Sequence, residues 1–141
     1  MRSYPGSCLC GKVRFSATQV KTRHHVCHCT MCRRWGGAPG FAAQVGDFEL
    51  AGTEYVREYE SSASARRGFC AECGSNLYYF LVPTKTYYVS VGAFDNADSF
   101  ELVGELFVEE QPVGYRYAGD LTRLTGEEFV AMLNATDTSG E

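Results

Sequence analysis

Seven cysteines gathered in three short clusters are the residues of this chain best suited to chemistry. The clusters are Cys8–Cys10, Cys27–Cys32 and Cys70–Cys73, and together they hold every cysteine in the 141 residues. Closely spaced cysteines present two sulfurs to one ion, and zinc binds four such ligands tetrahedrally. The spacing therefore predicts zinc binding rather than buried free thiols.

Glycines indicate which clusters share an ion. Gly11 and Gly74 each follow the second cysteine of their cluster, whereas Arg33 follows the last cysteine of the middle cluster. Glycine tolerates the positive φ of a tight turn, and such a turn aims backbone amides at sulfur. We therefore expect the outer clusters to form one closed structural site that ties the first strand region to the strand near Asn76. Its four ligands are Cys8, Cys10, Cys70 and Cys73.

The middle cluster supplies only three sulfurs, those of Cys27, Cys29 and Cys32. Three protein ligands leave one tetrahedral position vacant, as in catalytic zinc sites. Water or a substrate atom would occupy that position, and zinc would hold a substrate thiol there as a thiolate at neutral pH. We therefore predict two zinc ions per chain, one structural and one catalytic.

Histidines near this cluster leave an alternative open, in which a fourth protein ligand closes the site and both zincs are structural. The candidates are His24, His25 and His28. His28 lies between two cysteines, so in an extended segment its side chain points away from the metal. We expect it to make a hydrogen bond nearby, and we count it among the catalytic candidates because imidazole titrates near neutral pH.

Two arginines directly beside the open cluster, Arg33 and Arg34, could bind a carboxylate-bearing thiol such as glutathione through their guanidinium forks. Of the two, Arg33 is the candidate binding residue. The alternative is a pair of solvated arginines that pair with surface acids. A second pair, Arg66 and Arg67, is expected to lie on a strand surface.

Short strands must position these clusters. Apolar residues alternate with polar ones at 12–17 and again at 55–59, and largely apolar or aromatic runs at 76–82, 87–91 and 106–108 predict further strands. A capping box at Thr125 and Glu128 favours one helix near the end, with a short surface turn as the alternative. We predict a mainly β single domain over 1–135 with at most one or two short helices, and a flexible tail at 136–141.

Composition narrows the functional classes. The net charge of −4 and the lack of a basic block argue against nucleic-acid binding, which needs cations for the phosphates. The sequence shows no apolar run of membrane-spanning length and no secretory signal after Met1. We expect a cytoplasmic location, where seven cysteines indicate metal binding or catalysis rather than disulfides.

The chain resembles the family of glutathione-dependent formaldehyde-activating enzymes, which also includes centromere protein V. The match runs from about Gly6 to Gly126, and its motifs are Cys8-x-Cys10-Gly11, Cys27-His28-Cys29-x-x-Cys32-Arg33 and Phe69-Cys70-x-x-Cys73-Gly74-Ser75. The resemblance implies a β-tent fold, a structural zinc on the outer clusters and a catalytic zinc on the middle one. It also implies a carbon–sulfur lyase, with S-(hydroxymethyl)glutathione as the linked species and glutathione as co-substrate.

A zinc-stabilised module that binds protein or peptide partners without catalysis is the alternative to an enzyme, because a fold alone does not fix a function. Later residues also depart from the pattern of the family. Glu105 stands where a histidine is expected, and Gly114, before Tyr115, stands where a tryptophan is expected. The departures spare the cysteines, but a lost tryptophan would reshape any pocket wall that it lined.

Overall fold

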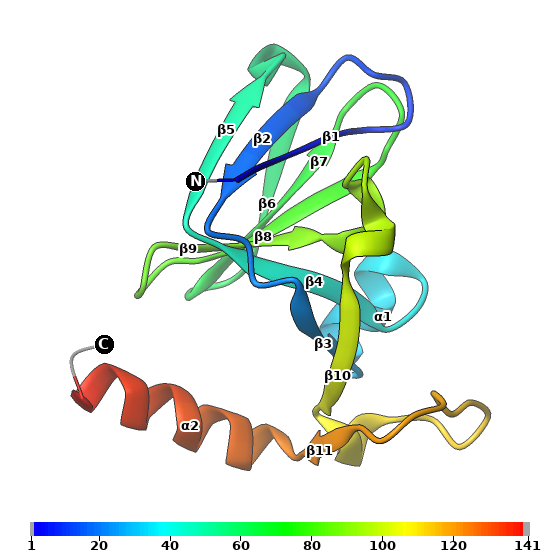
Figure 1. The fold of residues 1–141 in the computed structure, drawn as a ribbon, viewed down its shortest axis with the longest axis vertical. Helices are drawn as coiled ribbons and strands as arrows, with labels where there is room; N and C mark the ends of the chain where they lie inside the picture. The colour runs from blue at the N-terminus through cyan, green and yellow to red at the C-terminus, as the bar shows by residue number, and fades with distance from the viewer. Residues whose placement is uncertain (1, 140–141) are drawn as a thin grey trace. The chain divides into compact units, whose positions relative to one another are not determined.

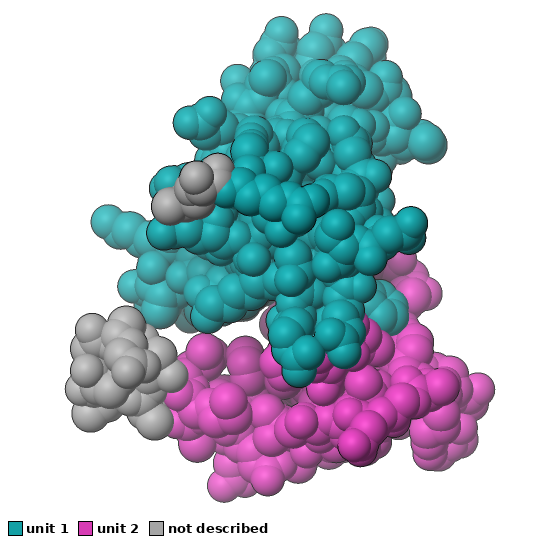
Figure 2. All heavy atoms as spheres, in the orientation of Figure 1, with its two compact units in different colours: residues 1–24, 41–101 teal, residues 25–40, 102–141 magenta. Residues whose placement is uncertain are grey.

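The computed structural model describes the backbone of residues 2–139 and the side chains of residues 2–134 (Figure 1). The chain forms two compact units, each made of two segments (Figure 2). Unit 1 comprises Met1–His24 and Phe41–Glu101, and unit 2 comprises His25–Gly40 and Leu102–Glu141. The mainly β class is confirmed, since eleven strands accompany two α-helices within residues 2–139. No helix in this described part is long and apolar enough to cross a membrane.

Unit 1 consists of antiparallel strands in two sheet regions. One runs in the order β1-β2-β5 and the other in the order β4-β9-β8-β7-β6. Short 3-10 turns connect some strands: η1 (Thr53–Tyr55), η2 (Val91–Ala93) and η3 (Ala97–Ser99). The strands are β1 (Ser3–Ser7), β2 (Arg14–Thr18), β4 (Gly40–Val45), β5 (Asp47–Ala51), β6 (Val56–Ser62), β7 (Ala65–Cys70), β8 (Asn76–Leu81) and β9 (Thr86–Ser90).

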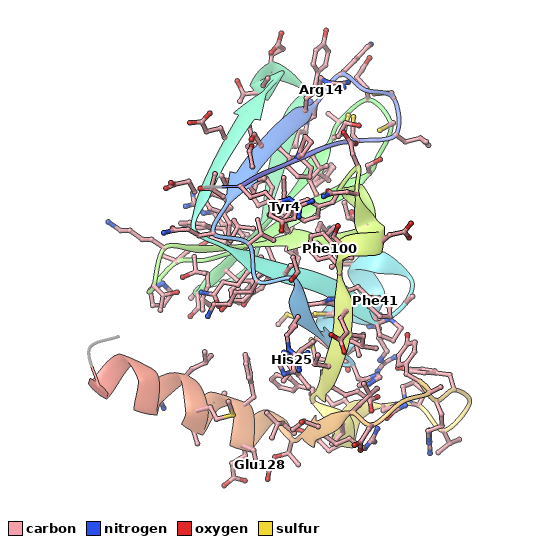
Figure 3. All side chains as sticks on the ribbon, in the orientation of Figure 1. Tyr4, Arg14, His25, Phe41, Phe100 and Glu128 are labelled. Atoms are coloured by element: carbon pink, nitrogen blue, oxygen red, sulfur yellow. The ribbon has the colours of Figure 1, made fainter. Side chains whose placement is uncertain are left out.

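Aromatic side chains from both sheet regions form the core of unit 1. Phe48 of β5 lies 5.5 Å from Tyr78 of β8 and 4.9 Å from Tyr87 of β9, measured between ring centroids. The rings of Tyr4 and Phe100 lie 6.0 Å apart and are labelled in Figure 3. Such rings bury large apolar areas, and their burial stabilises a protein core. This core holds the turns at the ends of the strands in place.

Two of those turns carry the outer cysteine clusters. Cys8 and Cys10 lie in the turn between β1 and β2, whereas Cys70 ends β7 and Cys73 lies in the turn that leads to β8. The glycines that follow have φ values of +81° at residue 11 and +80° at residue 74. An L side chain is strained at such angles, which explains why glycine occupies both places.

Unit 2 contains three strands in the order β11-β10-β3, with β10 and β11 parallel. Its elements are β3 (Arg23–Cys27), α1 (Thr30–Gly36), β10 (Glu101–Leu106), η4 (Val108–Glu110), β11 (Thr122–Leu124) and α2 (Gly126–Ser139). Helix α1 was not anticipated from the sequence. It begins after Cys29, whose sulfur accepts a bond from the amide of Cys32 at 3.3 Å, and Gly37, with a φ of +77°, caps its C-terminal end.

The capping box predicted for the last helix is present. The amide of Glu128 donates to the hydroxyl of Thr125 at 3.1 Å, and the amide of Thr125 donates to the Glu128 carboxylate at 2.8 Å. Glu128 lies in the first turn of α2 (Figure 3). The backbone of residues 136–139 belongs to α2, and residues 140 and 141 lie outside the described part. The flexibility expected for 136–141 is not tested by these observations and stays a prediction.

Two expectations about local structure were wrong. The strand expected at 106–108 ends at Leu106, because Phe107 adopts a left-handed conformation with a φ of +56° and a 3-10 turn follows. Arg67 was expected on a strand surface, yet only 3% of it is exposed. Its Nε donates to the hydroxyl of Ser61 at 3.2 Å, and its guanidinium stacks over the ring of Tyr79 at 5.0 Å. Its neighbour Arg66 remains 45% exposed at the side chain.

Candidate functional site

The four cysteines of the outer clusters meet within unit 1. All four sulfurs lie within 4.8 Å of one another, with 3.6 Å between Cys8 and Cys10 and 3.8 Å between Cys10 and Cys70. Thiolates at about 2.3 Å from a tetrahedral zinc lie about 3.8 Å apart, so this spacing fits such an ion. Cys8 and Cys70 are buried, Cys73 is partly exposed and Cys10 is exposed.

Backbone amides and one hydroxyl point at these sulfurs. The amide of Val13 donates to Cys8 Sγ at 3.3 Å. The hydroxyl of Ser75, 3.2 Å from Cys73 Sγ, and the amide of the same residue lower the pKa of Cys73 to about 5. The amide of Lys12 lowers the pKa of Cys10, but desolvation and the neighbouring sulfurs outweigh it and raise that pKa to about 11. A divalent cation bound by the four sulfurs would offset the repulsion between their negative charges.

The three cysteines of the middle cluster meet within unit 2. Cys27 ends β3, Cys29 caps α1 and Cys32 lies in its first turn, and their sulfurs all lie within 4.8 Å of one another. Each of the three is partly exposed. Hydrogen bonds from the neighbouring sulfurs, together with desolvation, hold the pKa of Cys27 far above its ordinary value. Three sulfurs that cannot share negative charge fit a cation that would offset it.

The backbone of Gly40 approaches this cluster closely. A methyl group at residue 40 would lie 3.4 Å from Cys32 Cβ and 3.6 Å from its Sγ. Glycine therefore keeps free the space beside one of the three sulfurs, as a site that admits a further ligand requires.

His28 is fully buried, and both of its ring nitrogens have partners. Nε2 lies 2.8 Å from Glu105 Oε1, and Nδ1 lies 2.8 Å from the hydroxyl of Tyr115. Glu105 is itself only 2% exposed, and its second oxygen accepts a bond from Arg123 Nη1 at 2.5 Å. We call Arg123, Glu105, His28 and Tyr115 the polar chain. It begins at a half-exposed guanidinium and ends at a partly exposed tyrosine.

A second route joins the two ends of the polar chain. Gln111 accepts a bond from Arg123 Nη2 at 2.9 Å and donates from Nε2 to the backbone carbonyl of Tyr115 at 3.0 Å. Tyr115 is thus held at its hydroxyl by His28 and at its backbone by Gln111. Its ring also packs against the imidazole of His28 at 5.5 Å between centroids. Together these contacts hold Tyr115 in place in the irregular loop between η4 and β11.

Arg33 holds the backbone at the start of the middle cluster. Its Nε donates to the carbonyl of His28 at 3.0 Å, and its Nη2 donates to the hydroxyl of Thr30 at 3.4 Å. Within the described side chains, neither bond uses Nη1, which leaves that end of the fork available to a carboxylate. Arg34, the next residue, is exposed.

The other histidines do not join either sulfur group in the described residues. His24 is 6% exposed, and its Nδ1 lies 3.3 Å from the carbonyl of Thr22. Its ring packs against Phe41 and Phe100. His25 packs against Gly104, where an added Cβ would lie 2.5 Å from the imidazole. His24 and His25 therefore pack against neighbouring residues of the fold.

Sequence reasoning missed most of the polar chain. Glu105 was noticed only as a departure from a family pattern, and Arg123 and Gln111 carried no signal, because side-chain partners this far apart cannot be read from spacing. The one available signal was the isolated acid Glu105 within an apolar run, since a buried carboxylate needs a partner. Gly114 faces open space, with no atom within 4 Å of an added Cβ, so a larger residue would fit there.

Three kinds of comparison with known proteins each give a match. The family model described as glutathione-dependent formaldehyde-activating enzyme matches residues 3–110. An uncharacterized lyase of Schizosaccharomyces pombe is 28% identical over 132 residues, covering 92% of this chain and 96% of that protein. A Halomonas elongata protein, whose name places it among glutathione-dependent formaldehyde-activating enzymes, is 33% identical over 88 residues, covering 53% of this chain and 54% of its own. A crystal structure of a Rhodobacter sphaeroides protein matches with a TM-score of 0.57 and 25% identity, covering 65% of this chain and 88% of that one.

Proposed function

Because the chain belongs to the family of glutathione-dependent formaldehyde-activating enzymes, we propose that it is a zinc-dependent carbon–sulfur lyase acting on a glutathione-like thiol and a small aldehyde. The observation that carries this proposal is the group of three sulfurs in unit 2. Among the described residues, no histidine or carboxylate completes that group, whereas the group in unit 1 has four sulfurs. Unequal groups of this kind suit one structural and one reactive ion.

The three sulfurs of Cys27, Cys29 and Cys32 would hold the second ion and leave one tetrahedral position for the thiol. When bound, zinc supplies positive charge that keeps a thiol ionised at neutral pH. The space that Gly40 leaves beside Cys32 favours entry from that side.

The chain's own residues would bind and orient the reactants. Arg33 presents Nη1 to a carboxylate of the thiol, while its other nitrogens brace the backbone of the cluster. His28 cannot touch a ligand directly, since its ring is fully buried and both nitrogens are engaged. It is therefore a positioning residue rather than a direct proton shuttle.

The reaction balances without any further reagent. In the forward direction, the thiol releases its proton, its sulfur forms a bond to the aldehyde carbon, the carbonyl π electrons move to oxygen, and that oxygen takes up a proton. In the lyase direction, the hydroxyl of the S-hydroxyalkyl adduct loses its proton, the oxygen electrons form the carbonyl π bond, the carbon–sulfur bond breaks with its electron pair staying on sulfur, and the thiol regains a proton.

Calorimetry with glutathione tests the proposal on zinc-loaded protein. Cys29→Ser is the sharpest variant, because serine keeps a cap for α1 while it removes one of the three thiolates. We expect binding in the native protein and loss of binding in the variant. Equal affinities would rule out the thiol site at this cluster. Binding without any exchange of aldehyde would favour the alternative of a non-catalytic module.

A matched pair of arginine variants tests the carboxylate contact. Arg33→Ala should weaken glutathione binding roughly 10-fold, the effect of one lost charge-assisted hydrogen bond. Arg34→Ala removes an exposed neighbour of the same charge and should leave the affinity unchanged. Equal effects would indicate general electrostatic attraction rather than a contact at Arg33.

A further inference from the structure

The segment at the end of β10 is hydrogen-bonded to both neighbours of Cys29. The backbone amide of His28 donates to the carbonyl of Leu106 at 3.0 Å. The backbone amide of Thr30 donates to Glu110 Oε1 at 3.0 Å, and the hydroxyl of Thr30 donates to the same oxygen at 2.9 Å. Cys29 therefore lies between two residues that one short stretch of chain holds in place.

A sharp turn at Phe107 separates the two contacts. Phe107 has a φ of +56°, a left-handed conformation that is unfavourable for a bulky L residue. The 3-10 turn η4 follows directly and ends at Glu110. The ring of Phe107 packs against Phe129 of α2 at 6.2 Å between centroids, which holds the turn. Residues in such a conformation persist where the surrounding structure requires them, and they are common at functional sites.

The hydroxyl of Thr30 links Glu110 to Arg33. A carboxylate can only accept, so the hydroxyl uses its one hydrogen on Glu110 and offers a lone pair to Arg33. Nη2 of Arg33 donates to that oxygen at 3.4 Å, while Nε donates to the carbonyl of His28 at 3.0 Å. Both bonds use one edge of the planar guanidinium, so the opposite edge, which includes Nη1, can bind a ligand.

We propose that Glu110 is a positioning residue of the middle cysteine cluster: it fixes the backbone between Cys29 and Cys32, and through Thr30 it orients Arg33 for a carboxylate of the bound thiol. The inference rests on the proposed function for its ligand. Within the described side chains, no ion pair neutralises Arg33, so Glu110 restrains the guanidinium without a direct ion pair. A group that is held before binding loses less entropy when its ligand arrives.

The neighbouring acid Glu109 provides a matched control. Its carboxylate oxygens accept from the amide of Gly126 at 3.1 and 3.0 Å. From the same 3-10 turn, Glu109 and Glu110 thus each bond the amide of the first residue of a helix, which is Gly126 in α2 and Thr30 in α1. Replacing either acid with alanine removes one negative charge and one helix cap, but only Glu110 contacts the helix that carries a cysteine of the cluster.

Calorimetry of the zinc-loaded variants with glutathione separates positioning from general electrostatics. Loss of an acid near an anionic ligand would by itself strengthen binding. We expect Glu110→Ala to weaken binding about 10-fold instead, and Glu110→Gln, which keeps an acceptor oxygen for Thr30, to restore most of the affinity. Glu109→Ala should match the native protein. Unchanged or tighter binding in Glu110→Ala, or equal weakening in Glu109→Ala, would overturn the inference.

Variants at Thr30 test the link to Arg33. Thr30→Val removes the hydroxyl but keeps the size of the side chain and the amide that bonds Glu110. We expect its affinity for glutathione to fall about 5-fold, while its affinity for 2-mercaptoethanol, a thiol without a carboxylate, stays native. Thr30→Ser should restore the affinity for glutathione. Equal losses for both thiols, or no loss for either, would overturn the link. Thr30→Val also carries the test if Glu110→Ala does not fold.

Transfer of zinc to a chelating dye measures how firmly the cysteine segment is held, without any thiol ligand. We expect the more labile ion of Glu110→Ala to leave about 5-fold faster than in the native protein, and that of Glu109→Ala to leave at the native rate. A native rate in Glu110→Ala would overturn the role of Glu110 at the cluster. A native protein that binds neither thiol would overturn the proposed function, whereas the transfer rates would still decide whether Glu110 positions the cluster.

Discussion

His28 Nε2 lies 2.8 Å from Glu105 Oε1, and at most 2% of either side chain is exposed. The two residues are 77 positions apart, yet they form the buried centre of unit 2. The family resemblance leads one to expect a histidine at position 105, and a histidine there could either donate or accept. Glutamate can only accept, so this chain constrains the orientation of His28 more tightly than the family pattern would.

Loss of one ligand should have different consequences in the two cysteine groups. We expect Cys73→Ser to lose the ion of unit 1 and to unfold that unit, because structural zinc contributes on the order of 10 kcal/mol to small domains. Cys29→Ser should lose one equivalent of zinc and keep its urea unfolding transition near the native midpoint. Zinc analysis together with urea titration measures both. A soluble, cooperative and fully zinc-loaded Cys73→Ser protein would contradict the assignment of the structural site.

The positive φ after the outer clusters can be tested in isolation. An added methyl at Gly74 meets no atom within 4 Å, so Gly74→Ala acts only through its φ of +80°. We expect a loss of about 1–2 kcal/mol in the free energy of unfolding. Gly92→Ala is the matched control, since it also meets no atom and its φ is not positive. Urea titration of the zinc-loaded variants should separate the two, and equal stabilities would refute the argument from φ.

Alkaline pH should destabilise unit 1 through Tyr78. Desolvation and the hydrogen bond of its hydroxyl to Glu58, at 2.5 Å, raise the pKa of Tyr78 in the folded protein. Above about pH 10 the unfolded chain releases this proton more readily than the folded one, so the free energy of unfolding falls as pH rises. Below about pH 10, the protonated Tyr78 makes its full contribution to the free energy of unfolding.

Chemical denaturation between pH 8 and 11 measures this effect. The slope from one proton cannot exceed about 1.4 kcal/mol per pH unit. Tyr78→Phe should flatten the alkaline decline, whereas Tyr59→Phe, at an exposed tyrosine, should not. A decline of the same steepness in Tyr78→Phe would show that other groups cause it, such as Tyr87, whose pKa burial also raises.

Local patterns predicted the parts of this protein that depend on local chemistry. Alternation identified β2, where Phe15 and Ala17 are buried, and the glycines after the outer clusters have the positive φ that was expected. The capping box identified the start of α2. These features follow from residues within one or two turns of chain.

Features that depend on distant partners could not be predicted. Arg67 is buried because two residues on neighbouring strands contact its guanidinium: Ser61 accepts a hydrogen bond from Nε, and the ring of Tyr79 stacks against it. Helix α1 has only 7 residues, too few for a periodic pattern, although the glycine at its end was a usable signal. The polar chain joins residues from β10, β11 and an irregular loop to His28, and no spacing rule connects them.

Cadmium-113 NMR of protein reconstituted with cadmium tests the central claim most directly, because each thiolate site gives its own resonance. The account predicts two resonances per chain, of which only one shifts when glutathione is added, and this resonance disappears in Cys29→Ser. A single resonance, or two resonances of which neither shifts when glutathione is added, would contradict the claim that the three sulfurs of unit 2 form an open site for a thiol.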